Sequence, residues 1–223
     1  MSISSRIAFL KEKLPDQVKL VAVSKFHPAE KLREAYEAGI RIFGENRVQE
    51  LVAKRKLLPD DIEWHFIGPL QKNKVKDIAP FIHTIQSVDS LGLLQEIDKQ
   101  AARQARVIHV LMEIHIAMEE SKHGFTPEEC TEILAKKDLL SAYRNIRIDG
   151  LMGMATFTTN REQIRKEFHS LYNLFKELKS TCFKDSGYFT ELSMGMTGDY
   201  EIALSEGSTM LRIGSYIFGE QSD

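Results

Sequence analysis

The sequence predicts an α/β fold, a single (β/α)8 TIM barrel that spans residues 1–223 as one domain. Eight apolar runs of strand length alternate with amphipathic helical runs, which indicates a parallel sheet with helical crossovers. A doubly wound open sheet would satisfy the same alternation. We favour the barrel because eight such units in 223 residues fit a compact barrel, whose usual length is about 250 residues.

The elements follow from local patterns, taken in chain order. Residues 1–14 predict an extra helix before the first strand, because Ile3, Ile7, Leu10 and Leu14 form one apolar stripe among charged residues. Short apolar runs of the kind that fill buried parallel strands then recur along the chain. The expected strands are Lys19–Ser24, Gly39–Phe43, Glu63–Ile67, Ile82–Gln86, Val107–Ile114, Ile146–Met152, Phe189–Ser193 and Thr209–Ile213.

Helix-start signals and 3.6-residue periodicity predict the intervening helices. Pro28 is expected at the first helical position of the first of them, and Thr126 to Glu129 reads as a capping box. The expected helices are His27–Ala38, Asn46–Leu57, Lys72–Ile78, Leu91–Arg103, one that begins after Thr126, Asn160–Lys179 and Asp199–Ser205.

Composition excludes several classes of protein. The net charge of −2, from 30 basic and 32 acidic residues, argues against a dedicated nucleic-acid or membrane-surface binder. No uncharged stretch approaches the length of a membrane span, and the N-terminus lacks export features, so we expect a cytoplasmic protein. Cys130 and Cys182 are expected to be free thiols and show no metal-ligand spacing, so no metal site is predicted.

Lys25 is the candidate for reaction with an aldehyde. It follows an apolar run and precedes the helix start at Pro28, which places it at the carboxyl end of the first strand. We expect burial there to disfavour the ammonium and leave a neutral amine, which can form a Schiff base. A lysine that caps the strand and extends to water is the alternative.

The loops after the last two strands predict a phosphate site. Ser193, Gly195, Thr197, Gly214 and Ser215 offer hydroxyl groups and backbone that an anion can approach closely. Phosphate sites of barrels are frequently formed after strands seven and eight. Turn glycines without a ligand are the alternative at each loop.

Arg212 lies within an apolar strand, and arginine is rarely buried without a partner. It could pair with a buried acid such as Glu45 or Glu191. It could instead donate to a ligand's ring nitrogen, which would stay unprotonated because arginine keeps its proton. A lysine for an aldehyde, loops for a phosphate and an arginine for a ring nitrogen together predict pyridoxal 5′-phosphate (PLP) as the cofactor, with the three groups meeting in one pocket.

Six segments resemble the YggS/PROSC family of pyridoxal phosphate homeostasis proteins, over a span from residue 19 to residue 220. They are residues 21–25 (VAVSK), 43–50 (FGENRVQE), 64–74 (WHFIGPLQKNK), 150–152 (GLM), 192–196 (LSMGM) and 212–215 (RIGS). The resemblance implies a barrel like the N-terminal domain of alanine racemase, which is PLP fold type III. It implies a Schiff base at Lys25 and ring-nitrogen contact at Arg212. It also implies phosphate contacts, partly through backbone, at Ser193, Met194, Gly214 and Ser215.

The chain departs from the family pattern in three places. Strand five reads Leu-Met-Glu-Ile-His-Ile at residues 111–116, where a strand of the Gln-Val-Asn-Ile type is common. Residues 120–124 keep the shape of a Lys-Ser-Gly turn with His123 in place of a small residue, and residues 197–199 read Thr-Gly-Asp for Ser-Asp-Asp.

Two further residues are candidates for cofactor contact. Asn46 follows strand two and could face the cofactor, or could cap the next helix. His65 could pack beside the cofactor ring, or could be a core histidine with one satisfied hydrogen bond.

The sequence favours a non-enzymatic protein that holds PLP and acts in intracellular vitamin B6 homeostasis. A low-activity PLP-dependent amino-acid racemase or lyase is the alternative, and a Schiff-base aldolase acting on a phosphorylated sugar is a third. A racemase needs a second acid/base group, and of the tyrosines only Tyr200 and Tyr216 lie near the expected site, with the chain ending at Asp223. We expect a monomer whose partners are PLP, other B6 vitamers and PLP-dependent apoenzymes.

Overall fold

The computed structural model describes residues 1–118 and 124–219 and shows a closed barrel of eight parallel strands. Each strand pairs with the next in the sequence, and β8 pairs with β1 to close the barrel. This confirms the predicted barrel over the open sheet. The strands are β1 (Lys19–Val23), β2 (Ile42–Glu45), β3 (Glu63–Phe66), β4 (Thr84–Val88), β5 (Ile108–Ile114), β6 (Ile146–Gly153), β7 (Glu191–Ser193) and β8 (Met210–Ile213).

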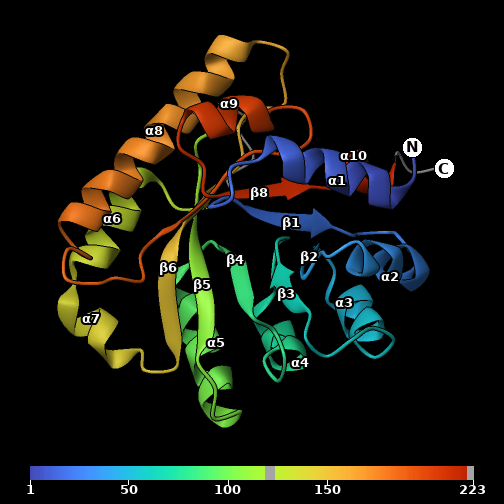
Figure 1. The fold of residues 1–223 in the computed structure, drawn as a ribbon. Coiled ribbons are helices and arrows are strands. Elements are labelled where there is room, and N and C mark those ends of the chain that lie inside the picture. Colours follow the sequence, from blue (N-terminus) through green and yellow to red (C-terminus); the bar gives the residue numbers. More distant parts are fainter. Residues whose placement is uncertain (119–123, 220–223) are drawn as a thin grey trace.

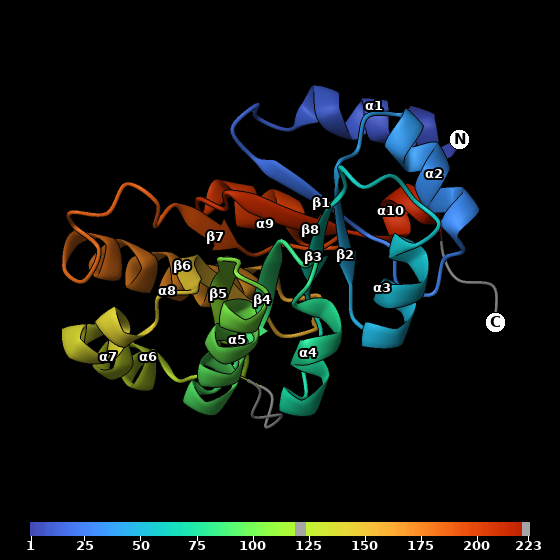
Figure 2. The same ribbon diagram turned by 90° about the horizontal axis from the view of Figure 1, so that it is seen from below.

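Helices surround the strands, as Figures 1 and 2 show. They are α1 (Ile3–Lys13), α2 (Ala29–Glu37), α3 (Val48–Arg55), the 3-10 helix η1 (Lys72–Lys74), α4 (Val75–Ile78), α5 (Leu91–Arg103), α6 (Pro127–Ala135), α7 (Lys137–Ala142), α8 (Arg161–Ser180), α9 (Tyr200–Ser205) and α10 (Ser215–Phe218). The capping box that starts α6 is present in full, because Thr126 and Glu129 each accept from the other's backbone N–H.

The predicted extra helix is α1, and it packs against α2 and α10 (Figure 1). Ser2 caps it by accepting from the backbone N–H of Ser5. Ile3, Ile7 and Leu10 are buried, as the apolar stripe predicts. The helix therefore covers the part of the barrel where the first and last units meet.

Two apolar layers hold the fold together. A small cluster of Val21, Leu111, Met152 and Met210 fills the inside of the barrel, with Ile42 packed against it. A much larger cluster joins the helices to the outward-facing strand residues. Polar side chains occupy the rest of the barrel interior, above and below that small cluster, and they form the two sites described below.

Several boundaries differ from the prediction. Pro28 is the N-cap of α2 with extended backbone, rather than its first helical residue. The second strand begins at Ile42 instead of Gly39, because Gly39 has φ +86° and the N–H of Ile40 donates to Ala35 O, which closes α2. The fourth begins at Thr84, because the Ile82 N–H still donates to Ile78 O in the preceding turn.

Some expected elements change in kind. The helix expected from Asn46 is the shorter α3, with Arg47 at its N-cap. The Lys72–Ile78 helix is divided into η1 and α4. Helices α7 and α10 were not expected, and the turn predicted at residues 120–124 lies almost wholly outside the described residues. Cys130 and Cys182 are free thiols, and within the described residues no helix combines the length and apolarity needed to cross a bilayer.

Candidate functional site

The segments that follow the strands gather at one end of the barrel, called here the carboxyl pole. The register of β1 and β8 pairs Val21 with Arg212 and Ala22 with Ile213, so the two chains leave the barrel side by side. A Cβ on Gly214 would lie 3.1 Å from the carbonyl oxygen of Val23. Lys25, two residues beyond β1, and Gly214, one residue beyond β8, therefore reach the same pole.

Lys25 is exposed, so the expected burial of its amine is wrong. Its Nζ lies 5.9 Å from the centroid of the Phe26 ring. Phe26 adopts φ +65°, in the left-handed region that non-glycine residues seldom occupy. The chain thus turns sharply after β1 and presents the lysine outside the last layer of the barrel, where an aldehyde in solution can reach it.

Arg212 is buried, with 4% of its surface exposed. One terminal nitrogen donates to the carbonyl oxygen and the hydroxyl of Ser193, at 2.9 and 2.6 Å, and the other donates to Gly153 O at 2.9 Å. Burial lowers the pKa of its guanidinium to about 10, against the attraction of the Glu113 and Asp199 carboxylates. Arg212 is therefore a buried cation that stays protonated at neutral pH.

The structure overturns the alternative that Arg212 pairs with Glu45 or Glu191. Glu45 accepts from Lys54 at 2.7 Å, and Glu191 accepts from Lys19 at 2.6 Å. Among the described residues, no carboxylate lies within 4.0 Å of the Arg212 guanidinium nitrogens. Within residues 1–118 and 124–219, the hydrogen-bond acceptors of Arg212 are neutral, and the Glu113 and Asp199 carboxylates attract its charge without a direct ion pair.

Ser193 and Met194 are buried where the resemblance implies phosphate contacts. The hydroxyl of Ser193 already donates to Gln86 Oε1 at 2.6 Å and accepts from Arg212. The Met194 N–H donates to Met210 O at 3.2 Å. In this structure Ser193 anchors Arg212, and the Ser193 hydroxyl proton and the Met194 N–H are both already bonded within the protein.

Gly214 and Ser215 form the second of the two loops. Gly214 is the N-cap of α10, and Ser215 is exposed directly after it. Among the described contacts, the backbone N–H groups of Ser215 and Tyr216 have no acceptor. Their donors are available to an anion, unlike the N–H of Met194.

Asn46 does not cap α3, which removes one of its two expected roles. The N-cap is Arg47, and the Oδ1 atom of Asn46 is buried without a hydrogen-bond partner among the described residues. A Cβ on Gly68 would lie 2.7 Å from Asn46 Cβ, so the glycine is needed for this close packing. The amide oxygen of Asn46 at the carboxyl pole thus has no hydrogen-bond partner within the part of the chain that the structure describes.

His65 lies elsewhere. It lines a pocket at the opposite end of the barrel, and its Nδ1 lies 2.8 Å from Gln86 Nε2. The expectation that it packs beside the cofactor ring is not supported by this placement. The structure shows the other reading, a core histidine with one satisfied hydrogen bond.

Comparison with known proteins places these features in a family. The family model described as "Alanine racemase, N-terminal domain" matches residues 2–222. A protein of Aquifex aeolicus named pyridoxal phosphate homeostasis protein is 40% identical over 204 residues, which cover 91% of this chain and 87% of the relative. The chain belongs to the pyridoxal phosphate homeostasis protein family.

Solved structures agree with this family membership. PipY of Synechococcus elongatus PCC7942, solved with PLP bound, has a TM-score of 0.86 and 36% identity, covering 98% of this chain and 100% of PipY. An alanine racemase of Clostridium difficile 630 has a TM-score of 0.75 at 16% identity, covering 100% of this chain and 56% of the racemase. The second likeness shows the shared fold alone.

This family member also contains a buried network that the sequence analysis missed. The ammonium of Lys54 donates to Glu45, to Ser24 O at 2.8 Å and to Glu50 at 3.2 Å, and Glu50 accepts from the Phe26 N–H at 2.9 Å. Burial raises the pKa of Glu45, and Lys54 opposes that rise. The network fixes residues 24–26, the turn that carries Lys25. A lysine on the apolar face of a predicted helix, three residues after Leu51, was the available signal.

Glu113 is the second residue that the sequence analysis missed. It lies near the end of β5 and is 7% exposed. Burial raises its pKa from the usual 4.5 to about 7, with the charge of Asp89 adding and that of Arg212 opposing. An acid that titrates near neutral pH therefore faces the buried guanidinium.

Proposed function

We propose that the chain binds PLP at the carboxyl pole and serves as a non-enzymatic carrier in vitamin B6 homeostasis. One observation carries the proposal: Arg212 is a buried, protonated guanidinium whose hydrogen-bonded partners among the described residues are all neutral acceptors. Such a group stabilises a ligand that brings a lone pair or a negative charge. PLP has a ring nitrogen and a phosphate.

The surrounding residues fit this cofactor. Lys25 offers an accessible amine for the aldehyde, and the N–H groups after Gly214 offer donors for an anion. Asn46 offers a buried amide oxygen that has no hydrogen-bond partner among the described residues. The buried network around Lys54 holds the turn that carries Lys25 in place. Relatives that are named for PLP homeostasis, and PipY solved with PLP, support the same cofactor.

Two features favour the carrier role over racemase chemistry: the protonated Arg212 opposite the ring nitrogen of PLP, and the poor fit of the nearby tyrosines to proton transfer. PLP, when bound, supplies an electron sink whose strength depends on protonation of its ring nitrogen. Arg212 offers that nitrogen only a donor, so the residue leaves the nitrogen unprotonated. A racemase also needs a second acid/base group, and Tyr200 and Tyr216 are poorly suited to that role.

Neither tyrosine of the carboxyl pole suits a proton transfer. Burial raises the pKa of Tyr200, with Glu201 and Tyr216 adding, so its phenol is neutral and cannot act as a base near neutral pH. The Tyr216 ring stacks on Phe9 of α1, with centroids 6.2 Å apart. We infer that the chain holds PLP without efficient turnover of amino acids.

The exposure of Lys25 also favours release of bound PLP. Water and incoming amines can reach an exposed attachment point, so the link can reverse without unfolding of the pole. We therefore propose that the protein exchanges PLP, and other B6 vitamers that carry the phosphate, with PLP-dependent apoenzymes. We propose that it does so as a cytoplasmic monomer.

Substitution of Lys25 tests the function. Lys25→Ala is expected to abolish covalent attachment, shown by loss of the visible absorbance of bound PLP and by loss of a borohydride-fixed adduct on the peptide containing residue 25. The fold should persist because the side chain is exposed, and weaker non-covalent binding should remain through Arg212. Lys56→Ala, an exposed lysine at the end of α3, is the matched control.

Two results would contradict the proposal. Attachment that survives in Lys25→Ala would place the cofactor on another lysine. Exchange of an amino acid's α-hydrogen at enzymatic rates, abolished by Lys25→Ala, would show a racemase or lyase in place of a carrier.

A further inference from the structure

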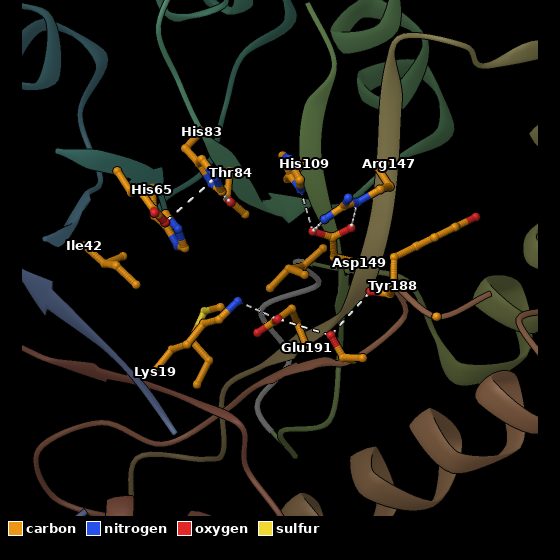
Figure 3. A pocket seen from close by; sticks show the side chains of 15 residues that line it. Lys19, Ile42, His65, His83, Thr84, His109, Arg147, Asp149, Tyr188 and Glu191 are labelled. Atoms are coloured by element: carbon orange, nitrogen blue, oxygen red, sulfur yellow. Dashed lines mark hydrogen bonds and ion pairs between the residues drawn. The ribbon is translucent and has the colours of Figure 1, made fainter. Parts of the chain in front are cut away.

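A second polar site lies at the opposite end of the barrel, called here the amino-pole pocket. Its volume is about 580 Å³, and it is lined mainly by residues at the starts of the strands (Figure 3). Its polar and charged lining residues are Lys19, Glu63, His65, His83, Thr84, His109, Arg147, Asp149, Tyr188, Thr190 and Glu191. None of these groups takes part in the PLP site proposed above, so the pocket needs its own explanation.

We propose that Glu63, His65 and His83 form a binding site for a divalent transition metal ion of the zinc type. One ligand atom from each residue lies within 4.8 Å of the other two. Two imidazoles and a carboxylate are a ligand set that zinc uses with a water in the fourth position. The ion itself is not part of this structure.

The strand geometry explains why the three side chains meet. Glu63 and His65 are two residues apart on β3, so both face the same side of the strand. His83 lies directly before β4, and its N–H donates to Trp64 O across the β3–β4 ladder. The His65 and His83 rings are nearly parallel, with centroids 5.8 Å apart and an interplanar angle of 7°. Figure 3 shows the two rings and His109 in a row.

Distances within the triad fit an ion better than direct contact. His83 Nε2 and Glu63 Oε2 are 3.8 Å apart, which is too long for a hydrogen bond. Two ligand atoms, each about 2.1 Å from a tetrahedral metal, lie about 3.4 Å apart. A small closure of side chains that are 40% and 48% exposed would reach that geometry, and their exposure gives an ion its entry path.

The second ring nitrogen of each histidine already has a partner, as metal-bound histidines require. His83 Nδ1 lies 2.8 Å from Thr84 Oγ1, and His65 Nδ1 lies 2.8 Å from Gln86 Nε2. The Thr84 hydroxyl can accept from His83 Nδ1–H, which leaves His83 Nε2 for the ion. The Gln86 amide, as oriented here, donates to His65 Nδ1 and accepts from the Ser193 hydroxyl, which leaves the proton on His65 Nε2. His65 therefore binds the ion through Nε2 when the Gln86 amide turns over and accepts from Nδ1–H.

The charge of the amino-pole pocket selects a cation. The two basic residues, Lys19 and Arg147, are each paired at 2.6 Å, with Glu191 and Asp149 respectively. Among the described residues, Glu63 is then the carboxylate in excess, with its Oε2 3.8 Å from His83 Nε2.

Zinc titration of the full-length chain tests the site. Chelator-treated protein, with and without PLP, is titrated with zinc chloride by calorimetry, and cobalt(II) provides a visible spectrum of the ligand field. We expect one ion per chain. Glu63→Gln and His83→Gln should each weaken binding by at least about tenfold, because even second-shell partners contribute about 10- to 100-fold. His169→Gln, an exposed histidine paired with Glu206 on the outside of the barrel, is the matched control.

The outcomes separate this site from the PLP site. Lys25→Ala should keep full zinc affinity, so failure of the carrier function would leave the metal result standing. Both test variants alter partly exposed side chains, and circular dichroism confirms that they fold. Wild type that binds no stoichiometric zinc, variants that bind as wild type, or loss of the same site in His169→Gln would each overturn the proposal.

Discussion

In the proposed carrier, two residues of the carboxyl pole have separate roles toward the cofactor. Lys25 is exposed and accessible to solutes, whereas Arg212 is buried and charged. We propose that binding energy comes from the buried residue and covalent capture from the exposed one. This division suits a protein that must both hold and release the same molecule.

Glu113 makes stability depend on pH in a way that can be measured. Its pKa is about 7 in the folded protein and about 4.5 when unfolded, so the folded state binds more protons between these values. The contribution of Glu113 to the free energy of unfolding is then largest below pH 4.5. It decreases by up to about 3 kcal/mol as the pH rises to about 7. Glu113→Gln should remove that slope. Urea unfolding at about pH 5 and about pH 7.5 measures the free energy of unfolding for both proteins.

The control for Glu113 is an exposed glutamate of α6, Glu128. Glu128→Gln should leave the pH dependence of wild type intact. A Glu113→Gln protein that loses stability between the two pH values as steeply as wild type would show that another group is responsible.

Residue types were easier to predict from the sequence than residue surroundings. Lys25 was placed correctly after β1, yet its burial was not, because the left-handed turn at Phe26 directs the chain out of the barrel. Arg212 was correctly expected to be buried. Its partners, Ser193 and Gly153, lie 19 and 59 residues away and depend on the closed register of the strands. A strand pattern read from sequence carries no such register.

At the level of elements, the loop after β7 positions the strand that holds Arg212. The N–H of Arg212 donates to Gly195 O at 3.0 Å. Gly195 has φ +97°, and a Cβ there would lie 2.6 Å from Ala203 Cβ and 2.8 Å from Leu211 Cδ2. The loop is therefore held tightly between α9 and β8, and only glycine fits at this position.

Gly195→Ala should lower stability by about 1–3 kcal/mol and weaken PLP binding, because backbone strain and overlap displace the strand of Arg212. Gly198 in the same loop is a matched control, since a Cβ there meets nothing within 4 Å. Thermal unfolding and PLP titration compare the two variants. Equal PLP affinity in both would show that the loop does not position the site.

Elements with a strong local signal were predicted well, and those stabilised by tertiary contacts were not. The Thr126 capping box and the apolar stripe of α8 are local, and both appear as expected. Helices α7 and α10 have six and four residues, too few to show a helical period. Strand β7 keeps only three residues of the five expected, because its single pairing with β8 is Ser193 with Met210.

At the scale of the whole molecule, a series of polar side-chain contacts connects the two poles. Arg212 donates to Ser193, the Ser193 hydroxyl donates to Gln86, and Gln86 lies 2.8 Å from His65. His65 then stacks on His83 in the amino-pole pocket. These contacts cross the barrel interior, where unpaired polar groups are costly, so we expect a change at one pole to affect the other. We expect the Gln86 amide to be the element that both poles bias, because its oxygen contacts Ser193 and its nitrogen contacts His65.

Gln86→Leu tests this connection because leucine keeps most of the volume and removes the side-chain hydrogen bonds to Ser193, His65 and Met210. The buried Ser193 hydroxyl and His65 ring then lose a partner, which we expect to lower stability by about 1–3 kcal/mol and PLP affinity severalfold. Ile85→Val, a buried apolar change on the same strand, should cost about 0.5–1.5 kcal/mol and leave PLP affinity unchanged.

By linkage, any factor by which zinc changes PLP affinity must equal the factor by which PLP changes zinc affinity. Gln86→Leu should bring that shared factor towards one, and a variant that loses stability but keeps wild-type PLP affinity and coupling would show that the two poles act independently.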